Sequence, residues 1–159
     1  MKIKNFDINS NSQVFIIAEL SANHNGSIDT AIKTIRAAKR AGANCIKLQT
    51  YTAETMTINS KKDDFTIKGT VWDRRNLFDL YKEAYTPWEW HEKLFEVAAE
   101  EGLICFSSPF DITAVDFLES LNTPAYKIAS FEITDIPLIE YVASKGKPLI
   151  ISTGIATTE

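Results

Sequence analysis

The stretch GANCIKLQT (Gly42–Thr50) carries the pattern that decides the fold: a glycine, a short apolar run and a polar end. The same order of residue types returns in GLICFSS (Gly102–Ser108) and in GKPLIIST (Gly146–Thr153). Glycine commonly ends a helix, and short runs that are apolar throughout are typical of strands covered on both faces. The repeated unit therefore predicts helices that alternate with buried parallel strands.

Two more apolar runs and four amphipathic segments fit the same alternation. Strands are expected in VFIIAEL (Val14–Leu20) and AYKIAS (Ala125–Ser130), and helices over residues 27–41, 86–102, 111–121 and 135–146. An open doubly wound sheet and a (β/α)8 barrel both satisfy this pattern, and both bind ligands at the carboxyl ends of their strands. A nucleotide-binding fold is disfavoured because SANHNGS, after the first strand, lacks a glycine-rich phosphate loop.

Two local predictions concern the chain between the second and third strands. For the helix over residues 86–102 we expect Thr86 as N-cap, Pro87 in the first turn and Glu89 completing a capping box. The preceding segment, Thr52–Arg75, is polar and has no clear helical period. It is predicted to be a long loop over the ligand-binding face, because loops of this length in compact α/β units are usually functional or mobile.

Composition limits the class of protein. The 159 residues are 45% hydrophobic and 24% charged, with a net charge of −4, which is typical of a soluble globular core. The mild acidity disfavours nucleic acid as a partner. Apolar runs are all far shorter than the roughly 20 residues of a membrane span, and the first residues, MKIKNFDINSNSQ, lack the apolar stretch typical of a signal peptide. Cys45 and Cys105 lie in apolar runs and are expected to be free thiols, so a cytoplasmic location is predicted.

Polar side chains close each predicted strand. They are Glu19; Lys47 and Gln49; Ser107 and Ser108; Lys127, Ser130 and Glu132; Ser152 and Thr153. These groups could meet solvent, or Lys47 could pair with Glu19 or Glu132. Taken together, two cations, several hydroxyls and two carboxylates favour a site for a phosphate and a polar substrate.

The fourth strand poses a problem of direction. Ser130 and Glu132 share a face by alternation, which puts Lys127 on the opposite side. Either a bulge re-aims Lys127, or it leans outward to another partner.

The histidines give a weaker signal: His24, in the first loop, has an open ligand role, and His91 is expected to be structural or exposed. Without a Cys or Asp cluster they make no complete metal site.

Five motifs in order resemble the sialic acid synthase family, whose members condense phosphoenolpyruvate with an amino-sugar to make nonulosonic acids. The motifs are IIAELSANHNG, IKLQTYT, CFSSPF, YKIASFE and IISTGIAT. The spellings AELSANHNG and KLQTY are most similar to the branch of the family that makes pseudaminic acid. The resemblance implies a (β/α)8 TIM barrel followed by a small antifreeze-like domain, a homodimer, and a divalent metal, Mn²⁺ or Mg²⁺.

The resemblance also implies roles for individual residues. It assigns phosphoenolpyruvate binding to Lys47, Ser108, Lys127, Ser130 and Ser152, sugar binding to Gln49, Tyr51 and Phe110, and catalysis to Glu19 and Glu132. The division of roles between the two glutamates stays open. The implied sugar is a 2,4-diacetamido-trideoxy hexose of the altrose type. The alternative is N-acetylneuraminate or legionaminate synthesis from N-acetylmannosamine or a diacetamido relative.

The resemblance implies more strands than the five predicted here, because a barrel of this kind needs eight. We expect residues 1–159 to hold the first five β/α units, with the histidine metal ligands and the antifreeze-like domain beyond residue 159, and this chain alone to be inactive. A non-catalytic half-barrel that binds a ligand weakly or completes itself by oligomerising is the alternative of another class. Synthases of 3-deoxy sugar acids are a third, disfavoured by the spellings SANHNG and STGIAT.

Overall fold

Five parallel strands form the central sheet of the computed structural model, which describes residues 1–157. They are β3 (Ile17–Glu19), β4 (Cys45–Thr50), β5 (Ile104–Pro109), β6 (Tyr126–Ile128) and β7 (Leu149–Ile151). Their order in the sheet follows the chain without reversal. A doubly wound sheet reverses at a switch point, so the arrangement is that of five successive β/α units of a (β/α)8 barrel.

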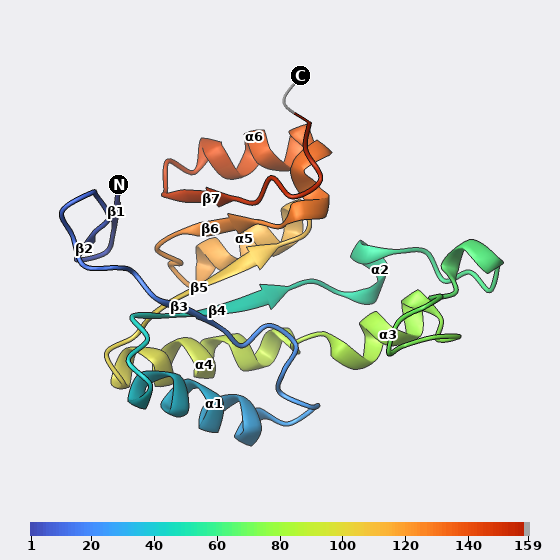
Figure 1. Cartoon of the computed structure of the whole chain (residues 1–159), viewed down its shortest axis with the longest axis horizontal. Helices are drawn as coiled ribbons and strands as arrows, with labels where there is room; N and C mark the ends of the chain where they lie inside the picture. Colours follow the sequence, from blue (N-terminus) through green and yellow to red (C-terminus); the bar gives the residue numbers. More distant parts are fainter. Residues whose placement is uncertain (158–159) are drawn as a thin grey trace.

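Helices cover one face of this sheet (Figure 1). They are α1 (Ile28–Arg40), α4 (Trp88–Glu100), α5 (Ile112–Ser120) and α6 (Ile136–Ser144). Ile46 and Leu48 of β4 pack in one cluster with Ile35 of α1 and Leu94 of α4. A second cluster joins Tyr126 and Ile128 of β6 to α5 and α6 through Val115, Leu118, Leu138 and Val142. Alternate residues of each strand therefore point into the helix layer, and the others point to the opposite, inner face.

Local capping explains where most helices begin and end. The side chains of Ser27, Asp111 and Asp135 accept backbone hydrogen bonds from the first turns of α1, α5 and α6. Gly42 lies just beyond α1 with φ +91°, which confirms its predicted role as a helix stop. The predicted capping box of α4 is wrong: Pro87 is the N-cap and carries no side-chain capping bond. The Thr86 hydroxyl instead donates to the Ser21 carbonyl at 3.4 Å, because Thr86 lies one residue too early to cap.

A short hairpin that the sequence did not predict closes one end of the inner face. It consists of β1 (Lys2–Ile3) and β2 (Phe6–Asp7). Ile3 is fully buried in a cluster with Cys45, Ile104, Phe106 and Ala125. The hairpin lies at the amino-terminal ends of the strands (Figure 1). The carboxyl ends, with their polar residues, lie at the other end of the sheet.

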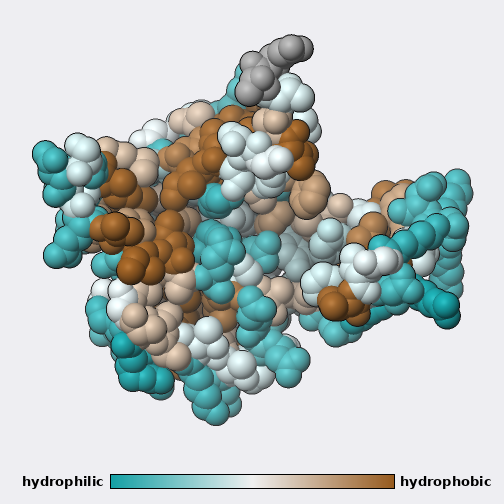
Figure 2. All heavy atoms as spheres, viewed as in Figure 1, coloured by the Kyte–Doolittle hydropathy of each residue, from teal (hydrophilic) through white to brown (hydrophobic). Residues whose placement is uncertain are grey.

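The segment predicted as a loop contains helical turns. It holds α2 (Ala53–Met56) and η1 (Asp63–Phe65), and α3 (Leu77–Ala84) follows it. Asn76 caps α3 by accepting from the backbone of Phe78. We call residues 52–85 the arm, because Figure 1 shows α2 and α3 projecting beyond the carboxyl end of β4. Figure 2 shows a mainly hydrophilic surface over the arm and apolar surface near the hairpin and β7.

Three strands are shorter than expected, and the fifth covers only Leu149–Ile151 of the predicted PLIIST (Pro148–Thr153). The first covers only Ile17–Glu19 of the predicted Val14–Leu20, and Val14 is 80% exposed because it has no neighbouring strand in the part described. The fourth ends at Ile128, and Ser130 opens the 3₁₀ helix η2 (Ser130–Thr134). In residues 1–157 no helix is both long enough and apolar enough to cross a bilayer.

Candidate active site

Three neighbouring strands place polar residues together on the inner face. The pairing of Glu19 with Lys47 and of Gln49 with Ser108 sets these side chains beside each other across β3, β4 and β5. Ser107 pairs with Tyr126, so Ser108 and Lys127 follow next to each other. Because the flanking residues Ile46, Leu48, Tyr126 and Ile128 pack into the helix layer, the polar residues point away from it.

Lys47 is a buried cation with one exposed partner. Its Nζ lies 3.5 Å from Glu19 Oε1, and the side chains are 7% and 62% exposed. One of the pairings expected from the sequence is therefore formed. Burying an ammonium costs several kcal/mol unless it is well paired, and a carboxylate exposed to water compensates that cost weakly. The site retains capacity for a further anion.

Lys127 adds a second cation to the same face. Its Nζ donates to the Ile128 carbonyl at 2.7 Å. Burial, and then the positive charge of Lys47, lower the pKa of Lys127. The carboxylates of Glu19 and Glu132 oppose this shift. The four charges are thus within electrostatic reach of one another, and the two ammonium groups would be stabilised by a bound anion.

The direction problem of the fourth strand is resolved by the 3₁₀ helix. Lys127 lies in the strand and faces inward, whereas Ser130 lies beyond its end, so strand alternation does not relate them. The expectation that Ser130 and Glu132 share a face is wrong for the same reason, because η2 has about three residues per turn. Ser130 Oγ lies against Gly154, where an added Cβ would come within 2.7 Å of it.

Ser152 joins Ser130 at the ends of β6 and β7. Its backbone N–H donates to the Ile128 carbonyl at 3.1 Å, and its side chain is half-buried. The close approach of Ser130 to Gly154 brings the two serines to neighbouring segments. The five residues predicted to bind an anion thus lie toward the carboxyl ends of four neighbouring strands, β4 to β7: Lys47, Ser108, Lys127, Ser130 and Ser152.

Three buried oxygens at the carboxyl end of the sheet lack hydrogen-bond partners among the described residues. They are Ser108 Oγ, on a residue that is 1% exposed, Glu132 Oε2, and Oδ2 of Asp111, the residue whose Oδ1 caps α5. A buried polar atom without a partner costs about 1–3 kcal/mol, so such atoms mark positions where a ligand can bind. Burial raises the pKa of Glu132, and the nearby Lys127 charge partly offsets this rise.

Aromatic side chains form one side of the site. Tyr51 and Phe110 follow β4 and β5, with ring centroids 5.4 Å apart and planes at 80°. Tyr81 of α3 meets Tyr51 in a similar edge-on contact at 5.8 Å. Sequence reasoning named Tyr51 and Phe110 but missed Tyr81. The apolar spacing of Leu77, Phe78 and Tyr81 after the capping residue Asn76 was the available signal.

The histidines lie away from the inner face. His24 is buried, accepts from the Gly26 N–H at Nδ1, and contacts Trp90 of α4 edge-on at 5.4 Å. His91 is buried in α4 and bonds to Thr50 on the helix side of β4. Within residues 1–157, no three His, Cys, Asp or Glu side chains gather to hold a metal ion. Cys45 and Cys105 are free and buried as predicted, and burial raises the pKa of Cys45 to about 12.

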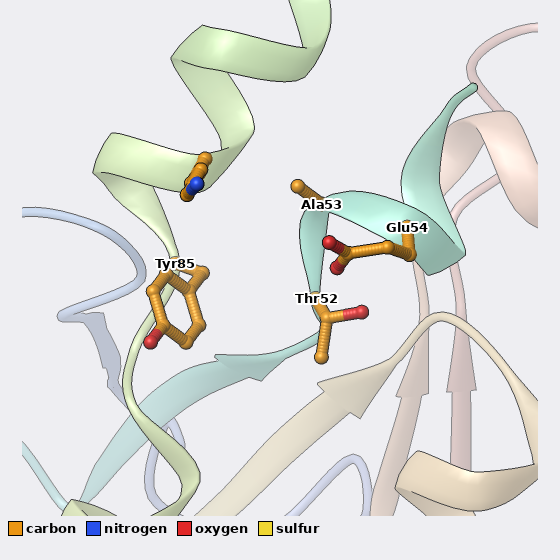
Figure 3. Close-up of a pocket in the computed structure, with 5 residues that line it drawn as sticks. Thr52, Ala53, Glu54 and Tyr85 are labelled. Carbon is orange, nitrogen blue, oxygen red and sulfur yellow. The ribbon is translucent and has the colours of Figure 1, made fainter. Parts of the chain in front are cut away.

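The arm holds a pocket of its own between α2 and α3. It has a volume of about 360 Å³ and is lined by Thr52, Ala53, Glu54, Lys82 and Tyr85. Figure 3 shows Glu54 and Thr52 on one side and the Tyr85 ring on the other. This pocket opens beside the carboxyl end of β4 and is separate from the inner-face lysines.

Such an arrangement, with lysine and serine side chains gathered at the carboxyl ends of parallel strands, is typical of the ligand-binding end of a (β/α)8-barrel protein. Comparison with known proteins specifies the kind of barrel. Residues 34–159 match the NeuB family, and the chain belongs to that family.

The relatives of this chain include several synthases. It is 55% identical to pseudaminic acid synthase of Campylobacter jejuni over 100% of this chain and 46% of that protein. It is 56% identical to pseudaminic acid synthase of Helicobacter pylori over 89% of this chain and 42% of that protein. It is 37% identical to N,N'-diacetyllegionaminic acid synthase of Legionella pneumophila over 92% of this chain and 41% of that protein. The chain therefore spans a little under half the length of these curated relatives.

A solved structure has the same fold. The N-acetylneuraminic acid (sialic acid) synthetase of Leptospira borgpetersenii, crystallised with citrate, superposes with a TM-score of 0.85 at 30% identity. The match covers 99% of this chain and 50% of that one. The expected family and the partial TIM-barrel fold are both confirmed.

Proposed function

We propose that the whole protein condenses phosphoenolpyruvate with a 2,4-diacetamido-trideoxy hexose of the altrose type, giving pseudaminic acid and phosphate. The observation that carries this proposal is the pair of inner-face ammonium groups, Lys47 and Lys127, beside the unpartnered Ser108 hydroxyl. Identity of 55% to the pseudaminic acid synthase of Campylobacter jejuni, against 37% to the legionaminic acid synthase of Legionella pneumophila, supports the choice of sugar.

The lysines and serines form the phosphoenolpyruvate site in this proposal. Lys47 and Lys127 neutralise the phosphate and the carboxylate, and the hydroxyls of Ser108, Ser130 and Ser152 orient them. Charge-assisted hydrogen bonds of this kind are each worth roughly 1.5–3 kcal/mol. Binding this anion also offsets the repulsion between the two ammonium groups.

The carboxylates and aromatic residues face the sugar and the reacting carbons. C3 of the enolpyruvate attacks C1 of the open-chain aldehyde, whose oxygen takes up a proton. Water adds at C2, and phosphate leaves with cleavage of the C–O bond. In this proposal Glu132, whose pKa is raised by burial, holds a proton near these atoms, and Glu19 is the carboxylate 3.5 Å from Lys47 Nζ. Gln49, Tyr51 and Phe110 position the sugar.

The remaining features are proposed for the whole protein. They are a complete barrel, of which residues 1–159 form the N-terminal part, an antifreeze-like domain, and a homodimer. A divalent metal, Mn²⁺ or Mg²⁺, belongs to the same proposal. Residues 1–157 do not supply a donor set for it, so no step is assigned to a metal here.

The test uses the protein expressed from its complete coding sequence. Phosphate release from phosphoenolpyruvate is measured with three sugars: the altrose-type diacetamido sugar, N-acetylmannosamine and a diacetamido relative of mannose. The highest kcat/KM is expected with the altrose-type sugar, with pseudaminic acid as product. Preference for N-acetylmannosamine would identify an N-acetylneuraminate synthase instead, and no phosphate release with any sugar would overturn the proposal.

A further inference from the structure

The arm brings an aromatic residue from outside the barrel strands to the predicted sugar site. Tyr51 is 3% exposed and Phe110 is 9% exposed, so both rings are fixed in the protein. Tyr81 of α3 is half-buried and packs edge-on against Tyr51. Among the three rings, Tyr81 is therefore the one with surface available to a ligand.

Glu132 lies in η2, just beyond the carboxyl end of β6, and Tyr81 contacts Tyr51, just beyond the carboxyl end of the parallel strand β4. Burial raises the pKa of the Tyr81 phenol, and the negative charge of Glu132 raises it further, so the phenol stays protonated and can donate a hydrogen bond. The two side chains are not hydrogen-bonded to each other in the described structure, and Glu132 Oε2 is buried without a partner. Tyr81 thus adds a protonated phenol to the ring contacts of Tyr51 and Phe110, and η2 contributes an unpartnered acceptor at the same end of the sheet.

An acetamido group matches this combination. Its carbonyl oxygen can accept from the Tyr81 hydroxyl, its N–H can donate to the Glu132 carboxylate, and its methyl group can pack against the rings. A simple sugar hydroxyl can satisfy one of the polar groups, but it brings no methyl group to the aromatic surface. Pockets that hydrogen-bond a substrate group discriminate strongly against analogues that lack it.

We propose that Tyr81, with Tyr51, Phe110 and Glu132, forms a subsite for an acetamido group of the sugar, and that Tyr81 is a specificity-determining residue. This inference rests on the proposed synthase function and names the part of the sugar that the site reads. It also gives the arm a function: α3 delivers the residue that completes the sugar site.

The test compares Tyr81→Phe and Tyr81→Ala with the unmodified enzyme, expressed from the complete coding sequence. KM is measured for the diacetamido sugar, for an analogue with one acetamido group replaced by hydroxyl, and for phosphoenolpyruvate. Loss of one hydrogen bond in Tyr81→Phe should raise KM for the diacetamido sugar about 5–10-fold, and Tyr81→Ala should raise it more. Both variants should bring KM for the diacetamido sugar closer to KM for the hydroxyl analogue. KM for phosphoenolpyruvate should stay unchanged.

Tyr85→Phe is the matched control, because Tyr85 follows α3 but lines the separate pocket of the arm. Its kinetic constants should equal those of the unmodified enzyme. Unchanged sugar KM in both Tyr81 variants, with an active parent enzyme, would overturn the subsite and leave the proposed function standing. An inactive parent would overturn the proposed function, and saturation-transfer NMR with the diacetamido sugar then tests the subsite. Loss of the acetamido methyl signal in Tyr81→Ala supports the subsite, and an equal signal overturns it.

Discussion

At the scale of single residues, Lys47 combines deep burial with incomplete pairing. A cation that served only the fold would be expected to meet a buried, hydrogen-bonded carboxylate. Lys47 instead faces the largely exposed Glu19 at 3.5 Å and shares the inner face with a second ammonium, that of Lys127. The arrangement is costly for the free protein and favourable once an anion is bound.

Lys47→Met should weaken phosphoenolpyruvate binding while leaving the fold intact. Loss of a charge-assisted contact worth roughly 1.5–3 kcal/mol raises KM for phosphoenolpyruvate about 10–100-fold. The thermal midpoint should stay equal or rise, because methionine removes a buried charge. Steady-state kinetics and thermal unfolding measure the two effects. Lys93→Met, at an exposed site on α4 paired with Glu96, is the control. An unchanged KM in Lys47→Met would remove this lysine from the site.

Glu132→Gln should lower turnover more than sugar binding, because the amide oxygen can still accept from the acetamido N–H. The amide keeps the shape of the side chain but cannot carry the proton, so kcat should fall by about 100-fold or more. Because burial raises the pKa of Glu132, its ionisation should appear in the acid limb of the pH profile of the parent enzyme and be missing from that of the variant. Glu140→Gln, at an exposed position on α6, should behave like the parent. Near-normal turnover of Glu132→Gln would exclude a catalytic role.

At the scale of elements, a buried chain of side chains ties α4 to β4 and β5 behind the site. His91 Nδ1 lies 3.2 Å from the Pro87 carbonyl, which can only accept, so Nδ1 carries the proton. Nε2 then accepts from the Thr50 hydroxyl at 2.9 Å. Thr50 Oγ1 in turn accepts from Ser107 at 2.7 Å. This order requires a neutral His91 and fixes the strand ends that carry Gln49 and Ser108.

Acid should therefore destabilise the protein through His91. Burial lowers the pKa of His91 to about 4 from its ordinary value of 6.5. Between pH 6.5 and 4 the unfolded chain binds a proton at this position and the folded chain does not, so stability falls as the pH falls. The stability is fully present above pH 6.5, and its loss reaches roughly 3 kcal/mol near pH 4.

His91→Gln tests this dependence. The variant should unfold more easily than the parent at pH 8, because the Thr50 bond is disturbed, but lose less stability between pH 6.5 and 4. Urea unfolding at pH 8, 6 and 5 measures both effects. Lys93→Met, two residues along α4 on its exposed side, should keep the pH dependence of the parent. Parallel pH curves for the parent and His91→Gln would contradict the proposed ionisation.

Some of these helices and strands could be predicted from the sequence, and others could not. The strands of the repeated glycine unit were found because each combines a stop, an apolar run and a polar end. α2 and α3 were missed because four and eight residues are too few for a clear 3.6-residue period. Alternation failed for Ser130 because the chain leaves the strand at Ile128, and no residue type marks the start of the 3₁₀ helix.

At the scale of the whole molecule, the two ends of the sheet have different roles. The hairpin fills the amino-terminal end of the inner face with apolar side chains, and the carboxyl end gathers the charges (Figure 1). Sequence alternation could place Lys47, Gln49 and Ser108 at that end, because they lie in or beside long, regular strands. It could not place Tyr81, whose position depends on how α3 packs against Tyr51 at the end of β4, nor the hairpin, whose two-residue strands have no period.

This separation of stability from binding predicts the effect of Ile3→Ala. Ile3 is fully buried against Cys45, Ile104 and Phe106, so removing its side chain should lower the free energy of unfolding by about 2–5 kcal/mol. KM for phosphoenolpyruvate should stay unchanged at a temperature where the variant is folded, because the lysines lie beyond the apolar layer that Ile3 covers. Urea unfolding and steady-state kinetics measure the two quantities.

The control is Ile58→Ala, with a side chain that is 66% exposed in the arm. It should change the free energy of unfolding by less than about 0.5 kcal/mol. A raised KM in Ile3→Ala would mean that the hairpin supports the anion site directly, and the two ends of the sheet would then have to be treated as one unit.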